Sequence, residues 1–342
     1  MSLKNLSVTI KIPKILKNKL NNNRVNQIYK KFEKTLNIDE NFIVAVSGGP
    51  DSLALAFLSK IYSIKRKVVS KYFIVDHKLR PESTLEAKKV KKILKKISIH
   101  SEILTWRGKK PKKNIQSLAR NERFKLLFNQ CEKFKIRNIL LGHHQDDLFE
   151  NFFIRMLRGS GLKGLVSLNK KSQIENKNLL RPLLDQKKED LIFVAKHVFS
   201  FYIKDPSNEN KKYQRIKIRK LFKELQKEGL DKKKFDKTIS NLRHSNNVID
   251  FYVKENLKKN AHFSGIKKKL ILNKDFFQKP YEVIFRALSD SIKLVGNKYY
   301  SARGKKLAKI INEVKNKKYL KLTLGGCIIE KVNQTVIISK EY

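Results

Sequence analysis

The sequence predicts an α/β protein in which a doubly wound, parallel, five-stranded sheet precedes a C-terminal domain of helices and short strands. Three observations favour this class. Short apolar runs alternate with longer helical patterns from residue 42 onward, a glycine-rich turn joins the first apolar run directly to a helix, and the pattern changes near residue 225 to lysine-rich helices. Such alternation is typical of a parallel sheet covered by helices on both faces.

The elements follow from the apolar periodicity, in chain order. We expect strands at 42–46, 68–75, 102–106 and 138–142, and helices at 52–64, 82–97, 115–134, 147–157 and 187–201. Further on we expect helices at 221–228, 232–257, 281–295 and 304–314, with short strands near 270–272, 319–324, 325–329 and 335–339. The domain boundaries then fall near residues 40 and 225, and residues 1–40 form a basic extension with one helix.

The composition indicates a polyanionic partner. The chain of 342 residues has 78 Lys and Arg against 31 Asp and Glu, a formal net charge of +47. Lys, Asn, Ile, Phe and Tyr share A/T-rich codons, so genome composition explains part of the lysine excess. The remaining charge favours nucleic acid as the partner, with binding that weakens as salt is added.

Cysteine usage and hydropathy indicate a cytoplasmic protein. Cys131 and Cys327 are far apart and form no Cys-x-x-Cys pair, so neither a disulfide framework nor a thiolate metal site is expected. No apolar run approaches the ~20 residues that span a bilayer, and the lysine-rich N-terminus lacks the apolar core of a signal peptide. We therefore expect no membrane association.

A glycine-rich turn forms the first candidate site. Residues Ser47, Gly48, Gly49, Pro50, Asp51 and Ser52 lie between the first strand and its helix. Glycines allow the backbone to approach an anion, and the N–H groups of a helix start point toward it. The turn lacks the Gly-Lys-Ser/Thr of a P-loop and the three spaced glycines of a dinucleotide site. Its hydroxyls and its carboxylate suit Mg²⁺-bound ATP attacked at the α-phosphate, and an ordinary serine- and glycine-rich turn is the less favoured alternative.

A second candidate site follows the fourth strand. His143 and His144 end that strand, and Asp147 and Glu150 lie three residues apart in the next helix, so both carboxylates share one helical face. Acids in a first helical turn are commonly solvated and favoured by the helix dipole. Here, however, the carboxyl ends of parallel strands bring them to the same sheet edge as the glycine-rich turn. The pair is therefore expected to hold an ammonium group or Mg²⁺.

Together these motifs resemble those of the tRNA(Ile)-lysidine synthase family, within the N-type ATP pyrophosphatases of adenine nucleotide alpha hydrolase-like fold. The similar segments occur in order: Ser-Gly-Gly-Pro-Asp-Ser at 47–52, Val-Asp-His-Lys-Leu-Arg at 75–80, Ala-Arg-Asn-Glu-Arg-Phe at 119–124, Arg-Gly-Ser-Gly at 158–161, Arg-Pro-Leu-Leu at 181–184 and Asp-Pro-Ser-Asn at 205–208. Lys78 replaces the family's usual glycine, which implies a turn that tolerates a side chain. The segment at 146–151, Asp-Asp-Leu-Phe-Glu-Asn, lacks the family's glutamine and threonine. Residues 323–327 resemble the first C-terminal subdomain, and the second subdomain of longer members is expected to be absent.

The resemblance implies a ligase that uses ATP and free L-lysine to convert the wobble cytidine of CAU-anticodon tRNA(Ile) to lysidine, through an adenylated cytidine. Residues 47–52 would then bind ATP, with Asp51 also a Mg²⁺ ligand, and Asp147 and Glu150 would bind the lysine. His143 and Arg120 would be catalytic, while tRNA contacts would come from Arg123, Arg215, Lys217 and Arg219. On this basis residues 41–225 are the ATP-pyrophosphatase catalytic domain and 226–342 the tRNA-binding domain. The oligomeric state stays open, with a homodimer among the possibilities.

Two other functions share parts of this pattern. A tRNA-thiolating ATP pyrophosphatase would have the same turn and sheet, but its usual paired cysteines are missing here. A non-catalytic RNA-binding protein would explain the charge, but it would have no need of Asp51, Asp147 and Glu150. Both alternatives are less favoured than lysine ligation.

Overall fold

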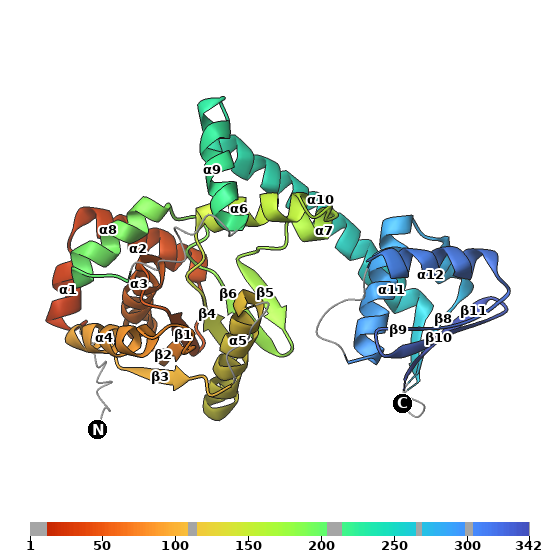
Figure 1. Ribbon diagram of the computed structural model, residues 1–342, viewed down its shortest axis with the longest axis horizontal. Helices are drawn as coiled ribbons and strands as arrows, with labels where there is room; N and C mark the ends of the chain where they lie inside the picture. Colours follow the sequence, from red (N-terminus) through yellow and green to blue (C-terminus); the bar gives the residue numbers. More distant parts are fainter. Residues whose placement is uncertain (1–11, 109–114, 204–213, 265–268, 298–303, 342) are drawn as a thin grey trace, which may run out of the picture. The chain divides into compact units, whose positions relative to one another are not determined.

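The computed structural model describes residues 12–108, 115–203, 214–264, 269–297 and 304–341. The chain divides into two compact units, Met1–Gly229 and Leu230–Tyr342 (Figure 1). The sequence had placed this boundary near residue 225. Within the described residues, no helix is long and apolar enough to span a membrane.

The first unit is built on a six-stranded sheet. Its strands are β1 (Phe42–Val46), β2 (Ser70–Asp76), β3 (Ser101–Thr105), β4 (Asn138–Leu140), β5 (Lys171–Ile174) and β6 (Lys177–Leu180), in the order β3-β2-β1-β4-β6-β5. The first five in this order are parallel, which confirms the predicted five-stranded parallel sheet, although β6 was not among the four strands whose ranges were expected. The sixth, β5, is an antiparallel edge strand that the sequence did not predict. Its residues, Lys-Ser-Gln-Ile, are too polar to register as a buried strand.

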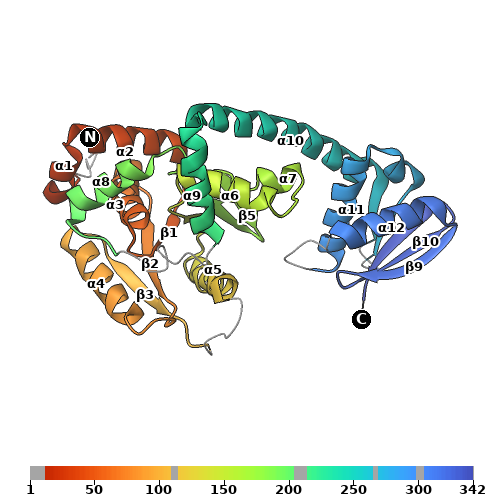
Figure 2. The ribbon, with the colours of Figure 1, turned by 45° about the horizontal axis from the view of Figure 1, so that its top comes forward.

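Helices cover both faces of this sheet (Figures 1 and 2). One face carries α1 (Lys14–Leu20), α2 (Asn23–Leu36), α3 (Pro50–Arg66), α4 (Ser83–Lys96) and α8 (Lys188–Phe199), and the other carries α5 (Ile115–Phe134). Successive residues of β1 point to opposite faces of the sheet. Val44 packs into the core on the side of α3, and Ile43 packs into the core on the side of α5.

Residues of the expected N-terminal extension belong to the core of the first unit. In α1 and α2 the side chains of Leu16, Val25, Tyr29 and Phe32 are fully buried against α3 and its neighbours. The extension is therefore not separate over α1 and α2, which corrects the boundary expected at residue 40. The one helix expected in this segment is confirmed as α2, and it packs on the domain, whereas α1 was not predicted.

The first unit has three further helices: α6 (Gln145–Met156) and α7 (Leu162–Leu165), which lie between β4 and β5 in the chain, and α9 (Gln214–Lys227), which follows α8. Helix α9 packs against α6, where the Phe222 ring stacks on Phe149 with a centroid distance of 4.9 Å. The sequence expected a helix only from residue 221. The structure extends it through the basic segment before Leu221.

The second unit is the predicted α+β domain. It contains α10 (Lys232–Asn260), β7 (Ala261–Ser264), β8 (Lys269–Leu272), η2 (Lys274–Gln278), α11 (Tyr281–Val295), α12 (Gly304–Asn316), β9 (Tyr319–Leu324), β10 (Cys327–Val332) and β11 (Thr335–Lys340). The strands form an antiparallel sheet in the order β7-β8-β11-β10-β9. Its own core includes Phe276, Ile284 and Leu288, all fully buried.

Candidate active site

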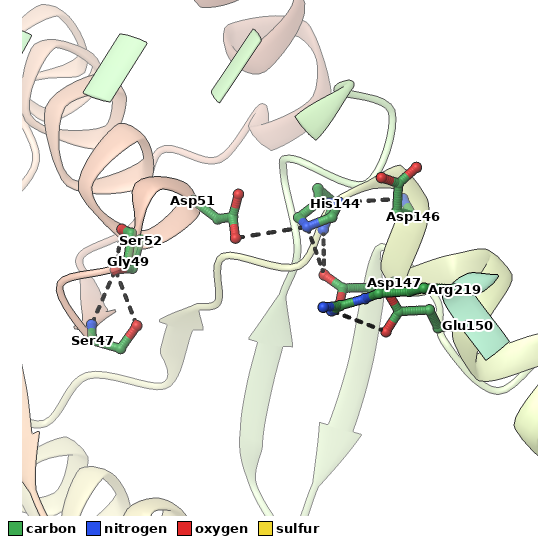
Figure 3. Close-up of polar contacts among 9 residues, drawn as sticks. All are labelled: Ser47, Gly49, Asp51, Ser52, His144, Asp146, Asp147, Glu150 and Arg219. Atoms are coloured by element: carbon green, nitrogen blue, oxygen red, sulfur yellow. Dashed lines mark hydrogen bonds and ion pairs between the residues drawn. The ribbon is translucent and has the colours of Figure 1, made fainter. Parts of the chain in front are cut away.

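The turn between β1 and α3 is closed by Ser52. Its Oγ accepts a hydrogen bond from the backbone N–H of Ser47 at 3.1 Å and donates to the Gly49 carbonyl at 3.0 Å (Figure 3). The same Oγ also accepts from the backbone N–H of Gly48 at 3.1 Å. Gly48 has φ +86°, and a Cβ there would lie 2.6 Å from Ile203 Cδ1. The turn therefore requires glycine at this position, for its left-handed backbone and for its close packing.

The first turn of α3 is the candidate anion-binding end of the site. Gly49 is the N-cap and Pro50 takes the first helical position. The first N–H groups of a helix have no carbonyl of their own helix to donate to, and the helix dipole adds partial positive charge. Ser47 and Gly48, which the sequence had assigned to phosphate binding, donate their N–H groups to Ser52 instead. We therefore expect the phosphate-binding N–H groups mainly in the first turn of α3.

The end of β4 lies against this helix. The chain leaves β4 through Gly142, where a Cβ would lie 3.3 Å from the carbonyl carbon of Asp51 and 3.3 Å from the nitrogen of Ser52. Any side chain at Gly142 would push the strand end and the helix apart. His143 and His144 follow immediately, so the two candidate sites, which are distant in the sequence, meet at this edge of the sheet.

His144 lies between Asp51 and Asp147 (Figure 3). Its Nε2 is 3.6 Å from Oδ2 of Asp51 and 3.6 Å from Oδ2 of Asp147, and its side chain is only 3% exposed. Its Nδ1 accepts a hydrogen bond from the backbone N–H of Asp146 at 3.2 Å, and its own backbone N–H donates to Asp147 Oδ2 at 3.0 Å. These two bonds form a capping box that begins α6.

Asp51 and Asp147 lie in different electrostatic environments. Burial raises the pKa of Asp51, and nearby His144 offsets this only in part. Burial acts in the same direction on Asp147, but the imidazoles of His144 and His143 and the backbone N–H of His144 outweigh it, so the pKa of Asp147 is lowered. A cation added beside the two carboxylates would therefore stabilise the ionised form of Asp51 more than that of Asp147.

Asp51 also has the chemistry of a Mg²⁺ ligand. Mg²⁺ is commonly bound by one or two carboxylates, with the other oxygens supplied by substrate phosphates and water. The described residues contain no group of three or more His, Cys, Asp or Glu that could hold a metal ion by themselves. Oδ1 of Asp51, in the first turn of α3, is buried and has no hydrogen-bond partner among the described residues. This arrangement suits a metal ion that arrives with a phosphate group.

Glu150 is paired with Arg219. The guanidinium Nε lies 2.5 Å from Oε1 and Nη2 lies 3.4 Å from Oε2, which joins α9 to α6. Burial raises the pKa of Glu150, and Arg219 offsets this only in part. The sequence had assigned Arg219 to the tRNA backbone, whereas in this structure it is bound to the carboxylate expected to hold lysine. A pattern of basic residues on α9 gave no sign of this partner, since it comes from a distant helix.

His143 lies among positive charges. Burial lowers its pKa to about 3, and Arg181, Arg120 and Arg123 act in the same direction, against Asp147. Its Nδ1 is buried and has no hydrogen-bond partner among the described residues. At neutral pH this imidazole is therefore uncharged, and it is a poor proton acceptor.

The arginines around His143 form a cluster, here called the arginine cluster and made of Arg120, Arg123, Arg181 and Arg215. Burial lowers the pKa of Arg123 to about 10, with Arg120 and Arg215 contributing, and it lowers the pKa of Arg181 to about 10, with Arg120 contributing. In the described part of the chain, the Nε atoms of Arg123 and Arg181 are buried without a partner. Closely spaced guanidinium groups are stabilised by phosphate, so the cluster suits a polyanion.

The structure thus brings most of the predicted site residues to one edge of the sheet. Arg215 and Lys217 are exposed on α9, as residues that contact a large partner would be. The segment at 205–208 lies outside the described residues. Sequence reasoning favoured His143 for catalysis and gave no role to Gly142. The pattern of a polar residue three positions before an acid at a helix start, which predicts a capping box, would have singled out His144.

Fold and site together define a class: a nucleotide-binding α/β protein of the adenine nucleotide alpha hydrolase type, whose candidate PP-loop is the turn at residues 47–52. A family model of the PP-loop domain matches residues 18–225. The chain is 37% identical over 313 residues to the tRNA(Ile)-lysidine synthase of Orientia tsutsugamushi, covering 87% of this chain and 69% of that protein. It is 33% identical over 304 residues to that of Wolbachia sp. subsp. Brugia malayi, covering 87% and 70%. This chain belongs to the tRNA(Ile)-lysidine synthase family.

A solved structure supports the fold independently. The U34-tRNA thiolase NcsA from Methanococcus maripaludis, solved with its [4Fe-4S] cluster, matches with a TM-score of 0.56 and 18% identity, over 65% of this chain and 79% of that chain. At this level of identity the match shows the shared fold alone. It confirms the predicted fold class.

Proposed function

We propose that this chain ligates lysine to C2 of the wobble cytidine of a CAU-anticodon tRNA(Ile), with ATP cleaved to AMP and pyrophosphate. One observation carries the proposal: PP-loop residue Asp51 and α6 residue Asp147 lie on either side of a single buried imidazole, both 3.6 Å from it. A phosphate-activating group and an amine-binding group thus adjoin, as a two-step ligation requires.

In the first step the cytosine C2 oxygen attacks the α-phosphorus of ATP and pyrophosphate leaves. Negative charge then grows on the phosphoryl oxygens, where the first turn of α3 and the arginine cluster would stabilise it. Mg²⁺, held by Asp51 and the phosphates, would add positive charge at the same place. The PP-loop would help by keeping its backbone in one conformation. The left-handed backbone of Gly48 and its hydrogen bond to Ser52 Oγ maintain that conformation.

In the second step the lysine amine attacks C2 and AMP leaves. The amine must lose a proton, and His143, with its pKa of about 3, is a poor acceptor. Glu150 is the better one, because its pKa is raised and because it lies on the same helical face as Asp147. The lysine ammonium would take the place of the Arg219 guanidinium at Glu150, since both are cations that satisfy the same carboxylate.

The tRNA would lie along the basic residues around the site. Arg120 and Arg123 on α5, and Arg215 and Lys217 on α9, would contact its backbone or the activated base. A wobble base is in a loop, so moving it into a pocket costs less than extracting it from a duplex. A cytoplasmic location, with both cysteines reduced, completes the proposal.

Thiolation is less well supported. Cys131 and Cys327 are both buried, and each belongs to a different compact unit. Burial also raises the pKa of Cys131 to about 11, which keeps it a thiol rather than a nucleophilic thiolate. Neither cysteine has the properties of a sulfur carrier.

The test of the proposal is direct incorporation. Purified protein is incubated with ATP, Mg²⁺, radiolabelled lysine and CAU-anticodon tRNA(Ile), and the wobble nucleoside is isolated. We expect label in that nucleoside and stoichiometric AMP. Folded protein that binds the tRNA but transfers no lysine would contradict the proposal.

Asp51→Ala tests the PP-loop within the same assay. We expect AMP and pyrophosphate release to fall by at least ~10³-fold, while tRNA binding stays unchanged, because Asp51 acts on ATP and not on the tRNA backbone. Asp39→Ala, which removes an exposed carboxylate of the same unit, is the matched control and should keep full activity. Normal turnover by Asp51→Ala would exclude Asp51 from the reaction.

A further inference from the structure

The hydrogen bonds of His144 define which of its ring nitrogens carries the proton. Nδ1 accepts from the backbone N–H of Asp146, and a nitrogen that accepts a hydrogen bond bears no proton. The proton of the neutral ring therefore lies on Nε2. This nitrogen points toward the two carboxylates, where a donor is favoured and an acceptor would be repelled.

A single N–H group thus faces two acceptor oxygens from different elements. Asp51 comes from the first turn of α3 and Asp147 from the first turn of α6, and Figure 3 shows them approaching the ring from different directions, Asp51 from the left and Asp147 from below. At 3.6 Å each distance is longer than a hydrogen bond, but a small movement of either carboxylate would close it. The imidazole ring cannot move freely toward either carboxylate, because it is buried and because its Nδ1 is hydrogen-bonded to the backbone of Asp146.

We propose that His144 is a positioning residue that aligns the nucleotide-side carboxylate Asp51 with the lysine-side carboxylate Asp147 through its one Nε2–H group. This inference rests on the proposed function for the roles of the two carboxylates. His144 contacts no reacting atom. Its effect is to keep both Oδ2 atoms at the same donor while substrates bind on either side. Misplacing a catalytic group by ~1 Å can cost about 10²-fold in rate, so the loss of this donor should be measurable.

Two substitutions separate the positioning role from the capping role. In His144→Asn the side-chain oxygen replaces Nδ1 and keeps the N-cap of α6, but nothing reaches the carboxylates. In His144→Gln the amide nitrogen replaces Nε2 and keeps the donor, but the cap bond to Asp146 is lost. A purely structural role predicts that the asparagine variant is the better enzyme. The positioning role predicts the opposite order.

The experiment measures the melting temperature, the kcat/KM for lysine, and calorimetric binding of a non-hydrolysable ATP analogue with Mg²⁺, in full-length protein. For His144→Asn we expect a melting temperature close to that of wild type, a kcat/KM for lysine lower by about 10²-fold and weaker binding of the analogue. For His144→Gln we expect a kcat/KM within about tenfold of wild type, even if the protein melts earlier. Wild-type kinetics in His144→Asn, or a lower kcat/KM in His144→Gln than in His144→Asn, would overturn the proposal.

A spectroscopic measurement keeps the proposal testable without activity. Long-range ¹H–¹⁵N correlation of labelled histidines, with His144 assigned by its loss in His144→Asn, reports which ring nitrogen is protonated. We expect a protonated Nε2 and a bare Nδ1, and the reverse tautomer would overturn the proposal. If wild-type protein fails to ligate lysine, the proposed function fails, yet the tautomer and the binding of the analogue still decide the role of His144.

Discussion

At the scale of single residues, Lys78 shows how a departure from the family pattern is accommodated. Its backbone has φ +48°, the left-handed region that glycine adopts without strain. Its N–H donates to Oδ1 of Asp76 at 3.0 Å, and Ser83 and Thr84 donate to the same carboxylate. This network holds the turn in a conformation that costs about 1 kcal/mol for a non-glycine residue. Asp76 thus supports a left-handed turn at a residue that is not glycine.

His77 and His143 lead to a prediction about pH. Burial lowers the pKa of His77 from 6.5 to about 4, with Arg123 contributing, and that of His143 to about 3. A histidine with a lowered pKa binds its proton more weakly in the folded chain than in the unfolded one, so its stabilising effect is complete above pH 6.5 and is lost as the pH falls. We expect the free energy of unfolding to decrease below pH 6.5, by up to about 1.4 kcal/mol per pH unit for each histidine, as measured by urea unfolding.

Histidine variants test which residues cause this pH dependence of the free energy of unfolding. His143→Gln and His77→Gln should each flatten the decrease between pH 6.5 and 4, since glutamine does not titrate. His100→Gln, which changes an exposed histidine of the same unit, should leave the curve unchanged. A decrease equally steep in all variants would show that other groups cause it.

At the scale of elements, the contact between α6 and α9 matters most for the site. Phe222 of α9 packs on Phe149 and Phe153 of α6, and beside it Arg219 is bound to Glu150. The apolar contact places α9 while the ion pair occupies one carboxylate of the site. Helix α9 thus connects the basic residues expected to meet tRNA with the residues expected to meet lysine.

Phe222→Ala should loosen this contact. We expect a loss of about 3 kcal/mol in the free energy of unfolding of the full chain, because a buried aromatic ring is removed from between two others. Leu221→Ala, on the exposed face of the same helix, should cost under about 0.5 kcal/mol. Similar losses for both variants would mean that the ring stack does not hold α9 in place.

At the scale of the whole molecule, the main feature is a large positive net charge. A net charge of +47 is spread over two units, each with its own apolar core. Exposed lysines recur on most helices, so electrostatic attraction to tRNA adds to whatever the site itself recognises. Affinity should therefore depend strongly on ionic strength.

We expect tRNA affinity to fall by about 10³-fold or more between 50 and 200 mM salt, if six or more phosphates are contacted. Lys217→Ala on α9 should lower the slope of log affinity against log salt by about one. Lys88→Ala on α4, an element that lies apart from α9 in both views of the first unit, should leave the slope unchanged (Figures 1 and 2). Filter binding across a salt series measures both. Equal slopes for wild type and Lys217→Ala would exclude a phosphate contact at Lys217.

Much of the fold could be predicted because its signals are local. The alternation of apolar runs and amphipathic stretches predicted four of the five parallel strands, all but β6, and the Ser-Gly-Gly turn predicted the start of α3. Strand β5 was missed because its residues are polar, and the short helix α1 was missed because lysines surround its apolar residues. Helix α2 was predicted, but as part of a separate extension. For β5 and α1, pairing or packing with residues distant in the sequence decides the structure, and the local pattern of apolar residues predicts it poorly.

By itself the sequence determined the order of the motifs and the family to which the chain belongs, and it singled out Asp51, Asp147 and Glu150 as candidate site residues. Only the tertiary structure decided which of these groups meet. His144 rather than His143 lies between the two aspartates, and Arg219 binds Glu150. The reason is physical: hydrogen bonds and ion pairs require atoms within ~4 Å, and residues from distant segments come that close only through the packing of β4 against α3 and of α9 against α6.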